Sequence, residues 1–248
     1  MDYLVVPVPM CIDVAKNNLE TPFQLFLLLK FLYRNGKTKL SAQERKAIAK
    51  ILGNTKQKSL KKNIHQLQEL KWLRHNSATG YYQIHSFDRL REKNDWPTRS
   101  GIVCYFDDLN HIFAIEGAAL YIYLYKDFWR KVKRDKVVRI KGRTYHSLPG
   151  TFHSKGRFAP VATTGVNALF DISISKASRL KHAAIKAGFI EVIKDFKELP
   201  IKPSEINLVR KYFTNEPNLV ILKDKVCLQL IDLILPNIPF KKRHKLKT

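Results

Sequence analysis

The sequence predicts an α+β fold that is mainly helical, with small β-hairpins. Two observations support this prediction. First, apolar residues recur every three or four positions in several stretches, as on helices that cover a core, and short alternating stretches with Gly or Asn turns follow them. Second, an order of three helices and a hairpin occurs near the N-terminus and recurs, more weakly, after residue 102. Because 248 residues suffice for two domains of about 100 residues each, we expect two copies of one small fold in tandem.

The predicted division of the chain follows changes in composition. In order, it consists of an N-terminal arm or strand (1–19), a first domain (20–88), a linker (89–101), a second domain (102–196) with a basic insertion (133–157), and a C-terminal helical segment with a basic tail (197–248). The arm alternates apolar residues with two prolines, which favours an edge strand. The linker is polar and contains a proline and a glycine.

The first two helices are predicted from their ends. Thr21-Pro22 is typical of a helix start, and Gly36 of a helix end. A second helix begins after Ser41, because Ser41-Ala-Gln-Glu44 is a capping box in which side chain and backbone satisfy each other's hydrogen bonds. Gly53 follows this helix at the position where a left-handed residue is favoured.

The third helix is predicted to begin after Asn54 or Thr55, one of which is its cap, and to continue to Leu70. Leu60, Ile64 and Leu67 recur at helical spacing and form a buried stripe. The face between them is dense in lysine, asparagine and glutamine. The second and third helices, joined by a turn that contains glycine, form a helix-turn-helix.

A β-hairpin is predicted to complete the first domain. Tyr82, Ile84 and Phe87 alternate imperfectly after a turn over Asn76 to Gly80. The second domain repeats this order with a strand "IVCYF", an apolar helix over about 113–132, a helix in "APVATTGVNALFDI" and a third helix that Ser173 or Ser175 caps. The basic insertion interrupts this copy as a hairpin or ordered loop. The later apolar run "NLVILKDKVCLQLIDLIL" predicts a packing helix that covers a domain or contacts another protein, including a second copy of the chain.

The Ser41 capping box, the Gly53 turn, the stretch "LKKNIHQLQELKWL" and the Tyr81-Tyr82 hairpin resemble a winged helix-turn-helix domain. Two such domains in tandem, over about residues 20–195, are similar to the two-winged-helix replication initiators of plasmids and phages. The resemblance implies that the third helix of each domain lies in the DNA major groove. It also implies that both domains bind repeated origin sequences and that the protein recruits the host replication machinery. A transcriptional regulator of a mobile element is the other role that this architecture allows.

Composition points to a polyanionic partner. Lys and Arg outnumber Asp and Glu by 45 to 21, which gives a net charge of +24. Such a charge repels itself in a compact fold, so double-stranded DNA, RNA or an anionic membrane surface are the candidate partners. RNA is less favoured because no aromatic RNA-binding strand motif is present. The most apolar run, "FQLFLLLKFLY", is too short to span a membrane, and three scattered cysteines favour a reducing, cytoplasmic location.

Candidate DNA-binding residues follow from the predicted third helices, the hairpin and the insertion. Lysine and arginine neutralise phosphates, and Asn, Gln, Ser and Arg hydrogen-bond base edges. In the first domain the candidates are Lys56, Lys58, Ser59, Lys61, Lys62, Asn63 and Gln66, with Thr79 and Tyr81 on the hairpin. In the insertion they are Lys133, Arg134, Lys136, Arg139, Lys141 and Arg143, and in the second domain Ser175, Lys176, Ser178, Arg179, Lys181 and His182.

Catalytic chemistry is not predicted. No phosphate-binding loop, nucleophile elbow or zinc-protease motif is present. His146, His153 and Tyr145 lie close in sequence, but a metal-dependent tyrosine nuclease needs two histidines that are separated by one apolar residue on the same strand. We therefore expect neither an enzyme nor a metal or cofactor. The alternative to sequence-specific binding is a structural protein of a nucleoprotein particle that holds nucleic acid without reading its sequence.

Overall fold

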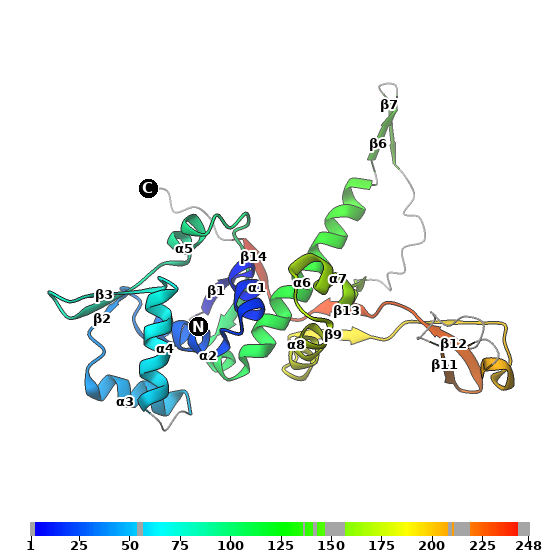
Figure 1. Cartoon of the computed structure of the whole chain (residues 1–248). Helices are drawn as coiled ribbons and strands as arrows, with labels where there is room; N and C mark the ends of the chain where they lie inside the picture. Colours follow the sequence, from blue (N-terminus) through cyan, green and yellow to red (C-terminus); the bar gives the residue numbers. More distant parts are fainter. Residues whose placement is uncertain are drawn as a thin grey trace.

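Figure 1 shows a computed structural model of the chain, which describes residues 3–53, 57–135, 137–140, 143–146, 157–207, 210 and 219–242. Over these residues the fold is mixed α+β, with helices and small antiparallel sheets of two or three strands. The predicted fold class is confirmed at this level. No helix in these ranges combines the length and the apolar character that crossing a membrane requires.

The first half consists of three helices and a three-stranded sheet. Its elements are α2 (Glu20–Leu32), β2 (Lys37–Thr38), α3 (Ala42–Ile51), α4 (Gln57–Glu69), β3 (Leu73–Asn76) and β4 (Tyr81–Ile84). Strand β4 lies between β2 and β3, and both pairings are antiparallel. The helices and hairpin predicted here are confirmed, although α2 begins one residue before Thr21 and has no side-chain cap.

Two local signals explain the ends of α3. The backbone N–H of Ser41 donates to the Glu44 carboxylate over 2.7 Å, and the backbone N–H of Glu44 donates to Ser41 Oγ over 3.3 Å. This is the predicted capping box. Gly53 has φ of 66°, a left-handed conformation that glycine adopts without steric cost. The residues predicted to cap α4, Asn54 and Thr55, lie outside the described residues.

The second half repeats the connection order of the first. Its elements are α6 (Ile112–Asp135), β8 (Ala159–Pro160), α7 (Thr163–Phe170), α8 (Ile174–Lys186), β9 (Ile190–Ile193) and β13 (Leu233–Pro236). Strand β13 lies between β8 and β9, as β4 lies between β2 and β3. Ser173 caps α8, since its Oγ accepts the Lys176 backbone N–H over 3.3 Å. A hairpin of β6 (Val137–Ile140) and β7 (Arg143–His146) follows α6, as predicted for the insertion.

The predicted C-terminal packing helix is wrong, because its residues form strands. Between β9 and β13 the chain adds β10 (Phe196–Glu198), a short 3₁₀ helix η2 (Pro203–Glu205), β11 (Leu219–Leu222) and β12 (Lys225–Gln229), and β14 (Phe240–Lys242) follows β13. Lys223 and Asp224 both have positive φ, so they form a tight hairpin turn that divides the apolar run. Val226 and Leu219 are buried in a small cluster separate from the main core. Strand β13 is the central strand of the sheet that it forms with β8 and β9.

The edge strand predicted in the N-terminal arm is confirmed, whereas the helix that follows it and the structure found in place of the linker are not predicted. Strand β1 (Tyr3–Pro7) pairs with β5 (Ser100–Tyr105), and α1 (Val8–Asn17) begins where Pro9 fits a first helical turn. Met10, Cys11 and Val14 of α1 are fully buried. In the predicted linker, α5 (Phe87–Lys93) buries Phe87 and Leu90, and a 3₁₀ helix η1 (Phe106–His111) follows β5. Apolar side chains attach both segments to the body of the protein.

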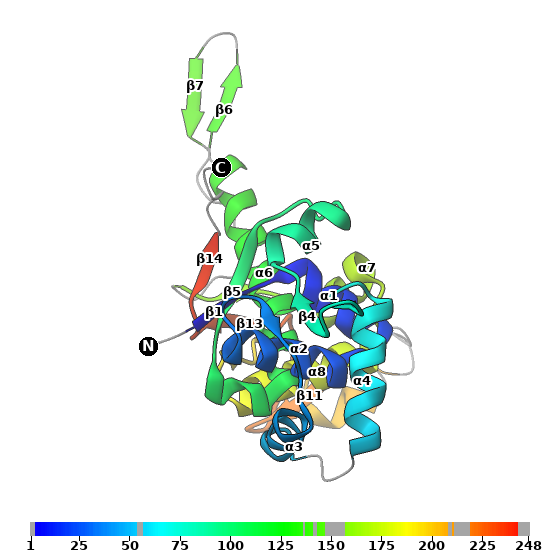
Figure 2. The same ribbon diagram turned by 90° about the vertical axis from the view of Figure 1, so that its left-hand side faces the viewer.

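A single core runs through both halves, and α6 lies at its centre (Figure 2). Helix α6 packs against α8 on one side and α1 on another. Gly117 of α6 permits the contact with α8, because a Cβ at this position would lie 2.1 Å from the Leu180 carbonyl oxygen. Ala118, Ala119, Ala177 and Ala184 are fully buried around this crossing. Small side chains therefore set how closely the two helices approach.

Glu116, also on α6, is fully buried with both carboxylate oxygens lacking a hydrogen-bond partner among the described residues. Burial raises the pKa of Glu116 to about 9; the charge of Glu20 raises it further, and that of Lys176 lowers it. Because the folded pKa lies above the ordinary value of 4.5, its stabilising effect is full below about pH 4.5 and is lost as pH rises through about 9.

We predict that Glu116→Gln flattens this pH dependence. The neutral amide has no proton to lose, so the variant should gain unfolding free energy over the wild type as pH rises from 5 to 9, on the order of a few kcal/mol. Urea unfolding at several pH values measures this difference. Glu191→Gln, at an exposed position on β9, is the control and should follow the wild type. A Glu116→Gln curve parallel to that of the wild type would contradict the assignment.

Candidate nucleic-acid interface

Helix α4 presents the polar face that the sequence predicts. Leu60, Ile64 and Leu67 are 2, 6 and 0% exposed, so one apolar stripe packs the helix against the core. Lys58, Lys61, Lys62 and His65 lie exposed beyond this stripe, and Ser59 and Gln66 are half-buried at its margin. His65 Nε2 lies 3.3 Å from the Glu69 carboxylate one turn later. The lysines have no acidic partner among the described residues, and Lys56 lies outside these residues.

Asn63 departs from the prediction, because it is only 6% exposed. It lies three residues after Leu60 and four before Leu67, so helical geometry places it on the buried stripe rather than on the polar face. Its Nδ2 has no hydrogen-bond partner in the described part of the chain. Gln66, rather than Asn63, is therefore the amide side chain of α4 that can meet a base edge.

The β3–β4 hairpin carries exposed polar and aromatic side chains beside this helix. Asn76 Oδ1 accepts the Ala78 backbone N–H over 3.0 Å, which orders the turn. Thr79 and Tyr81 are exposed, and Lys39 Nζ lies 5.0 Å from the centre of the Tyr81 ring. A groove of about 600 Å³ runs along this hairpin, lined by Asn35, Lys37, Asn76, Thr79, Tyr81, Tyr82 and Gln83. It presents hydrogen-bonding groups, two aromatic rings and one cation.

Helix α8 exposes a narrower polar face than predicted. Ser175, Arg179 and His182 recur at helical spacing and are exposed, with Ser178 half-buried between them. His182 Nδ1 lies 2.8 Å from the Ser178 carbonyl oxygen and donates a hydrogen bond to it, because a carbonyl only accepts. Lys186 continues the same face one turn beyond His182. Lys186 lies four residues after His182, a spacing that places it on this face, but the sequence prediction does not include it.

Lys176 and Lys181 do not belong to this face. Lys176 is 9% exposed and its Nζ pairs with Glu20 of α2 over 2.8 Å and donates to Asn18 Oδ1 over 2.7 Å. Lys181 is 5% exposed and forms an ion pair with Asp232, just before β13. Lys181 lies four residues after Ala177, on the stripe that packs against α6. Their cations are neutralised inside the protein, which corrects their prediction as phosphate contacts.

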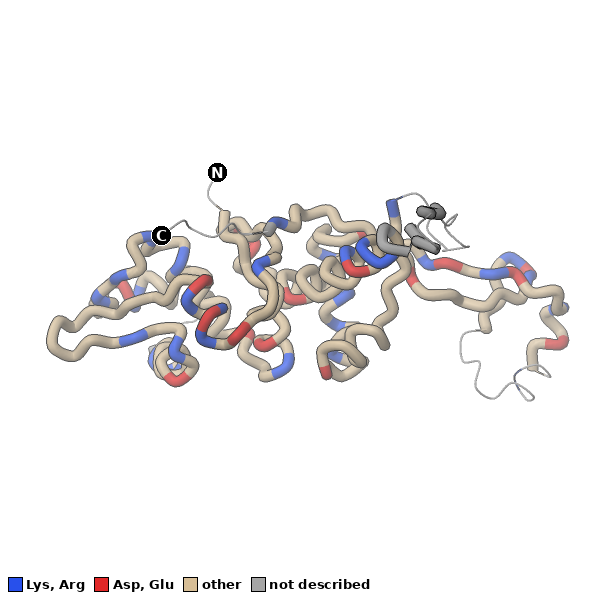
Figure 3. Tube along the Cα trace, turned by 90° about the horizontal axis from the view of Figure 1, so that it is seen from above, with Lys and Arg blue, Asp and Glu red and all other residues tan. Residues whose placement is uncertain are grey.

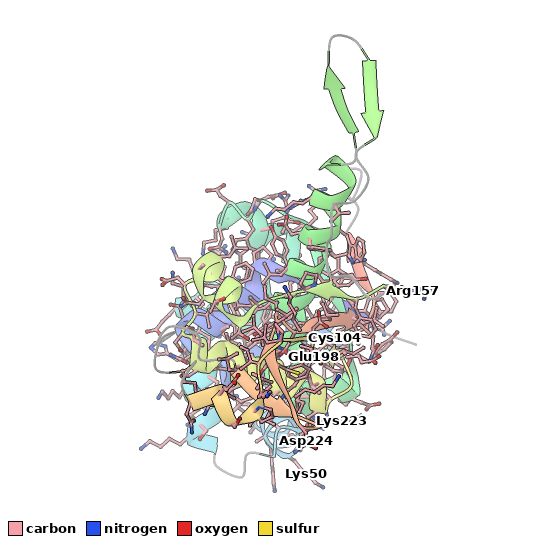
Figure 4. All side chains as sticks on the ribbon, turned by 90° about the vertical axis from the view of Figure 1, so that its right-hand side faces the viewer. Lys50, Cys104, Arg157, Glu198, Lys223 and Asp224 are labelled. Atoms are coloured by element: carbon pink, nitrogen blue, oxygen red, sulfur yellow. The ribbon has the colours of Figure 1, made fainter. Side chains whose placement is uncertain are left out.

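The basic insertion projects from the end of α6. The hairpin β6–β7 extends away from the body in two perpendicular views (Figures 1 and 2). Lys133 and Arg134 lie on the last turn of α6, Arg139 on β6 and Arg143 on β7. Lys136 and Lys141 fall outside the described residues, and so does His153. Where the chain returns to the body, Tyr125 donates its hydroxyl to the Arg157 carbonyl oxygen over 2.8 Å, and Figure 4 shows Arg157 at the edge of the molecule.

Positive charge is spread over both halves rather than gathered in one element. Lys and Arg recur along most of the trace in Figure 3, and Lys50, at the end of α3, points away from the body in Figure 4. No cluster of three metal-ligating side chains occurs within the described ranges. The chain matches no protein-family model, no curated protein and no solved structure.

The ion pair between Lys176 and Glu20 predicts a difference between neighbouring cations of α8. Lys176→Met should lower the unfolding free energy by roughly 3 kcal/mol, because it leaves the Glu20 carboxylate without its partner at a site only 16% exposed. Arg179→Met, at an exposed position, should change stability by less than about 0.5 kcal/mol.

A second substitution provides the control for Lys176. Adding Glu20→Gln to Lys176→Met removes the unpaired charge and should recover most of the lost stability. Urea unfolding of the four proteins measures these differences. Equal stability of Lys176→Met and Arg179→Met would show that the ion pair has no structural role.

Proposed function

We propose that the protein is a tandem winged helix-turn-helix protein that binds double-stranded DNA at specific sequences. The observation that supports this most directly is the repeated connection order. In each half, three helices and the three strands of one sheet occur in the order helix, strand, helix, helix, strand, strand, with the last strand at the centre of the sheet. In the second half, β6–β7 and the segment from β10 to β12 are inserted into this order. The third helix of each repeat, α4 and α8, carries the exposed polar face. That is the helix which enters the major groove in this class of domain.

The side chains on the two faces are of two kinds: some are suited to phosphate contacts, which position the protein on DNA, and others to base contacts, which read the sequence. On α4, Lys58, Lys61 and Lys62 are suited to phosphates, and Gln66 to an adenine edge. On α8, Arg179 is suited to a guanine edge, because its planar guanidinium donates two parallel hydrogen bonds. The β3–β4 hairpin extends the contact of the first half through Thr79 and Tyr81. In the second half, the chain between β9 and β13 forms a separate small sheet of β10, β12 and β11.

The biological role that we propose is that of a replication initiator or a transcriptional regulator of a mobile element, by resemblance to two-winged-helix initiators. Sequence-independent nucleic-acid binding is the second candidate. It is favoured by the burial of Asn63, Lys176 and Lys181, which leaves few side chains free to read bases. Selection of bound duplexes from a random pool separates the two: a recovered consensus supports the first, and its absence the second.

We predict that Lys58, Lys61 and Lys62 replaced together by Ala leave the fold intact but weaken DNA binding. None of the three lies on the buried stripe, and alanine favours helix formation. Each lost phosphate contact should reduce the slope of log affinity against log salt by about 0.9, up to roughly 2.7 for three. Titrations on selected and scrambled duplexes at several salt concentrations measure the slope.

Gln66→Ala is the contrasting variant. If Gln66 reads a base, this change should cost about 1–3 kcal/mol on the selected duplex alone and leave the salt slope nearly unchanged. Circular dichroism confirms that each variant is folded. A folded triple variant with wild-type affinity and slope would show that this face of α4 contacts only water.

A further inference from the structure

A second basic cluster lies away from the polar face of α4, where the first hairpin meets α5. Lys71 follows α4, Arg74 lies on β3, and Arg89 and Lys93 lie on α5; all four side chains are exposed. In Figures 1 and 2, α5 lies on the opposite side of the hairpin strands from α3. The cluster therefore combines cations from three segments at one end of the first half.

His85 shows that these cations converge. It is 7% exposed, and its Nδ1 donates to the Lys71 carbonyl oxygen over 2.8 Å, because a carbonyl only accepts. Burial lowers the pKa of His85, the hydrogen bond to Lys71 raises it, and Arg89, Lys93 and Arg74 lower it further. The ring therefore adds no charge of its own. Its Nε2 has no hydrogen-bond partner among the described residues.

The four cations are not neutralised within the described protein. None of them forms an ion pair with an acidic side chain in the described ranges, whereas Glu92 on the same helix pairs with Arg91 over 3.5 Å. Partial removal from water and the nearby charges of Lys71 and Arg89 lower the pKa of Lys93. Like charges held this close repel one another, so an external anion would relieve the repulsion.

We propose that Lys71, Arg74, Arg89 and Lys93 bind the phosphate backbone of duplex DNA that flanks the site contacted by α4. Charge complementarity favours this occupant, because a row of phosphates offers several negative charges to exposed cations from different elements. In Figures 1 and 2 the β6–β7 hairpin and α5 both lie toward the upper side of the molecule, although they are on opposite sides of it in Figure 1. The proposal depends on the proposed function only for the choice of DNA as the anion.

The test compares two duplexes that share the selected site. One spans only that site, and the other extends it by about two helical turns (about 20 base pairs) on each side. The cluster variant carries Lys71→Gln, Arg74→Gln, Arg89→Gln and Lys93→Gln. A control variant removes four exposed cations in and around the β10–β12–β11 sheet, to which no DNA contact is assigned, by Lys194→Gln, Lys197→Gln, Lys202→Gln and Lys223→Gln. Circular dichroism and urea unfolding check that all proteins are folded.

The cluster variant is expected to match the wild type on the short duplex. On the long duplex its salt slope should fall by up to about 3.6, at about 0.9 for each lost phosphate contact, and the control variant should fall by less. Equal slopes of cluster variant and wild type on the long duplex would overturn the proposal, as would an equal loss in the control variant.

Failure of this proposal differs from failure of the proposed function. If the triple lysine variant of α4 loses affinity and the cluster variant does not, α4 binds DNA and the cluster does not. If the cluster variant alone loses affinity for the long duplex, the α4 face is wrong and the cluster stands.

Discussion

The close crossing of α6 and α8 is the contact on which the rest of the structure depends. At Gly117 the two helices approach until the Leu180 carbonyl oxygen occupies the space of a side chain. Alanines on both helices fill the remaining interface, so the crossing excludes larger residues. Because α6 also packs against α1, the same helix joins the N-terminal segment, the first half and the second half in one core. The orientation of α8, and with it the exposed side of Arg179, follows from this contact.

Two ion pairs attach α8 to other neighbours and at the same time remove two cations from its exposed face. Lys176 connects α8 to the start of α2, and Lys181 connects α8 to the residue before the central strand of the second sheet. Removing either partner would leave a charge in a poorly solvated site, so these lysines are committed to the fold. The exposed cations of α8, Arg179 and Lys186, lie on a different face of the helix from these two lysines. One face of α8 therefore packs inside the protein, and another face is exposed to solvent.

Local signals in the sequence predicted local structure well. The capping box at Ser41, the glycine at 53 and the cap at Ser173 act over three or four residues, and each is found where predicted. The lysines of α4 were placed correctly for the same reason, since three apolar residues define the buried stripe. Asn63 departs from the prediction because a stripe defined by leucine and isoleucine alone omits this residue, although helical spacing puts residue 63 on it.

Long-range contacts explain what the sequence did not reveal. Glu20 lies 156 residues from Lys176, and Asp232 lies 51 residues from Lys181, so no local pattern marks either lysine as buried. The strands of the C-terminal run also depend on distant partners, because β13 pairs with β8 and β9, and β14 with β5. Composition alone does not distinguish an apolar stretch that pairs with distant strands from an apolar packing helix. The predicted linker is structured for the same reason, since Leu90 is buried against residues far away in sequence.

The most direct test of the two proposed DNA-binding faces is hydroxyl-radical footprinting on the selected duplex. Two helices in successive major grooves should protect two segments about one helical turn, about 10 base pairs, apart. The triple lysine variant of α4 should lose one protected segment, and Arg179→Ala the other. One uninterrupted protected stretch that neither variant divides, or loss of the same segment in both variants, would contradict the account of two faces in tandem.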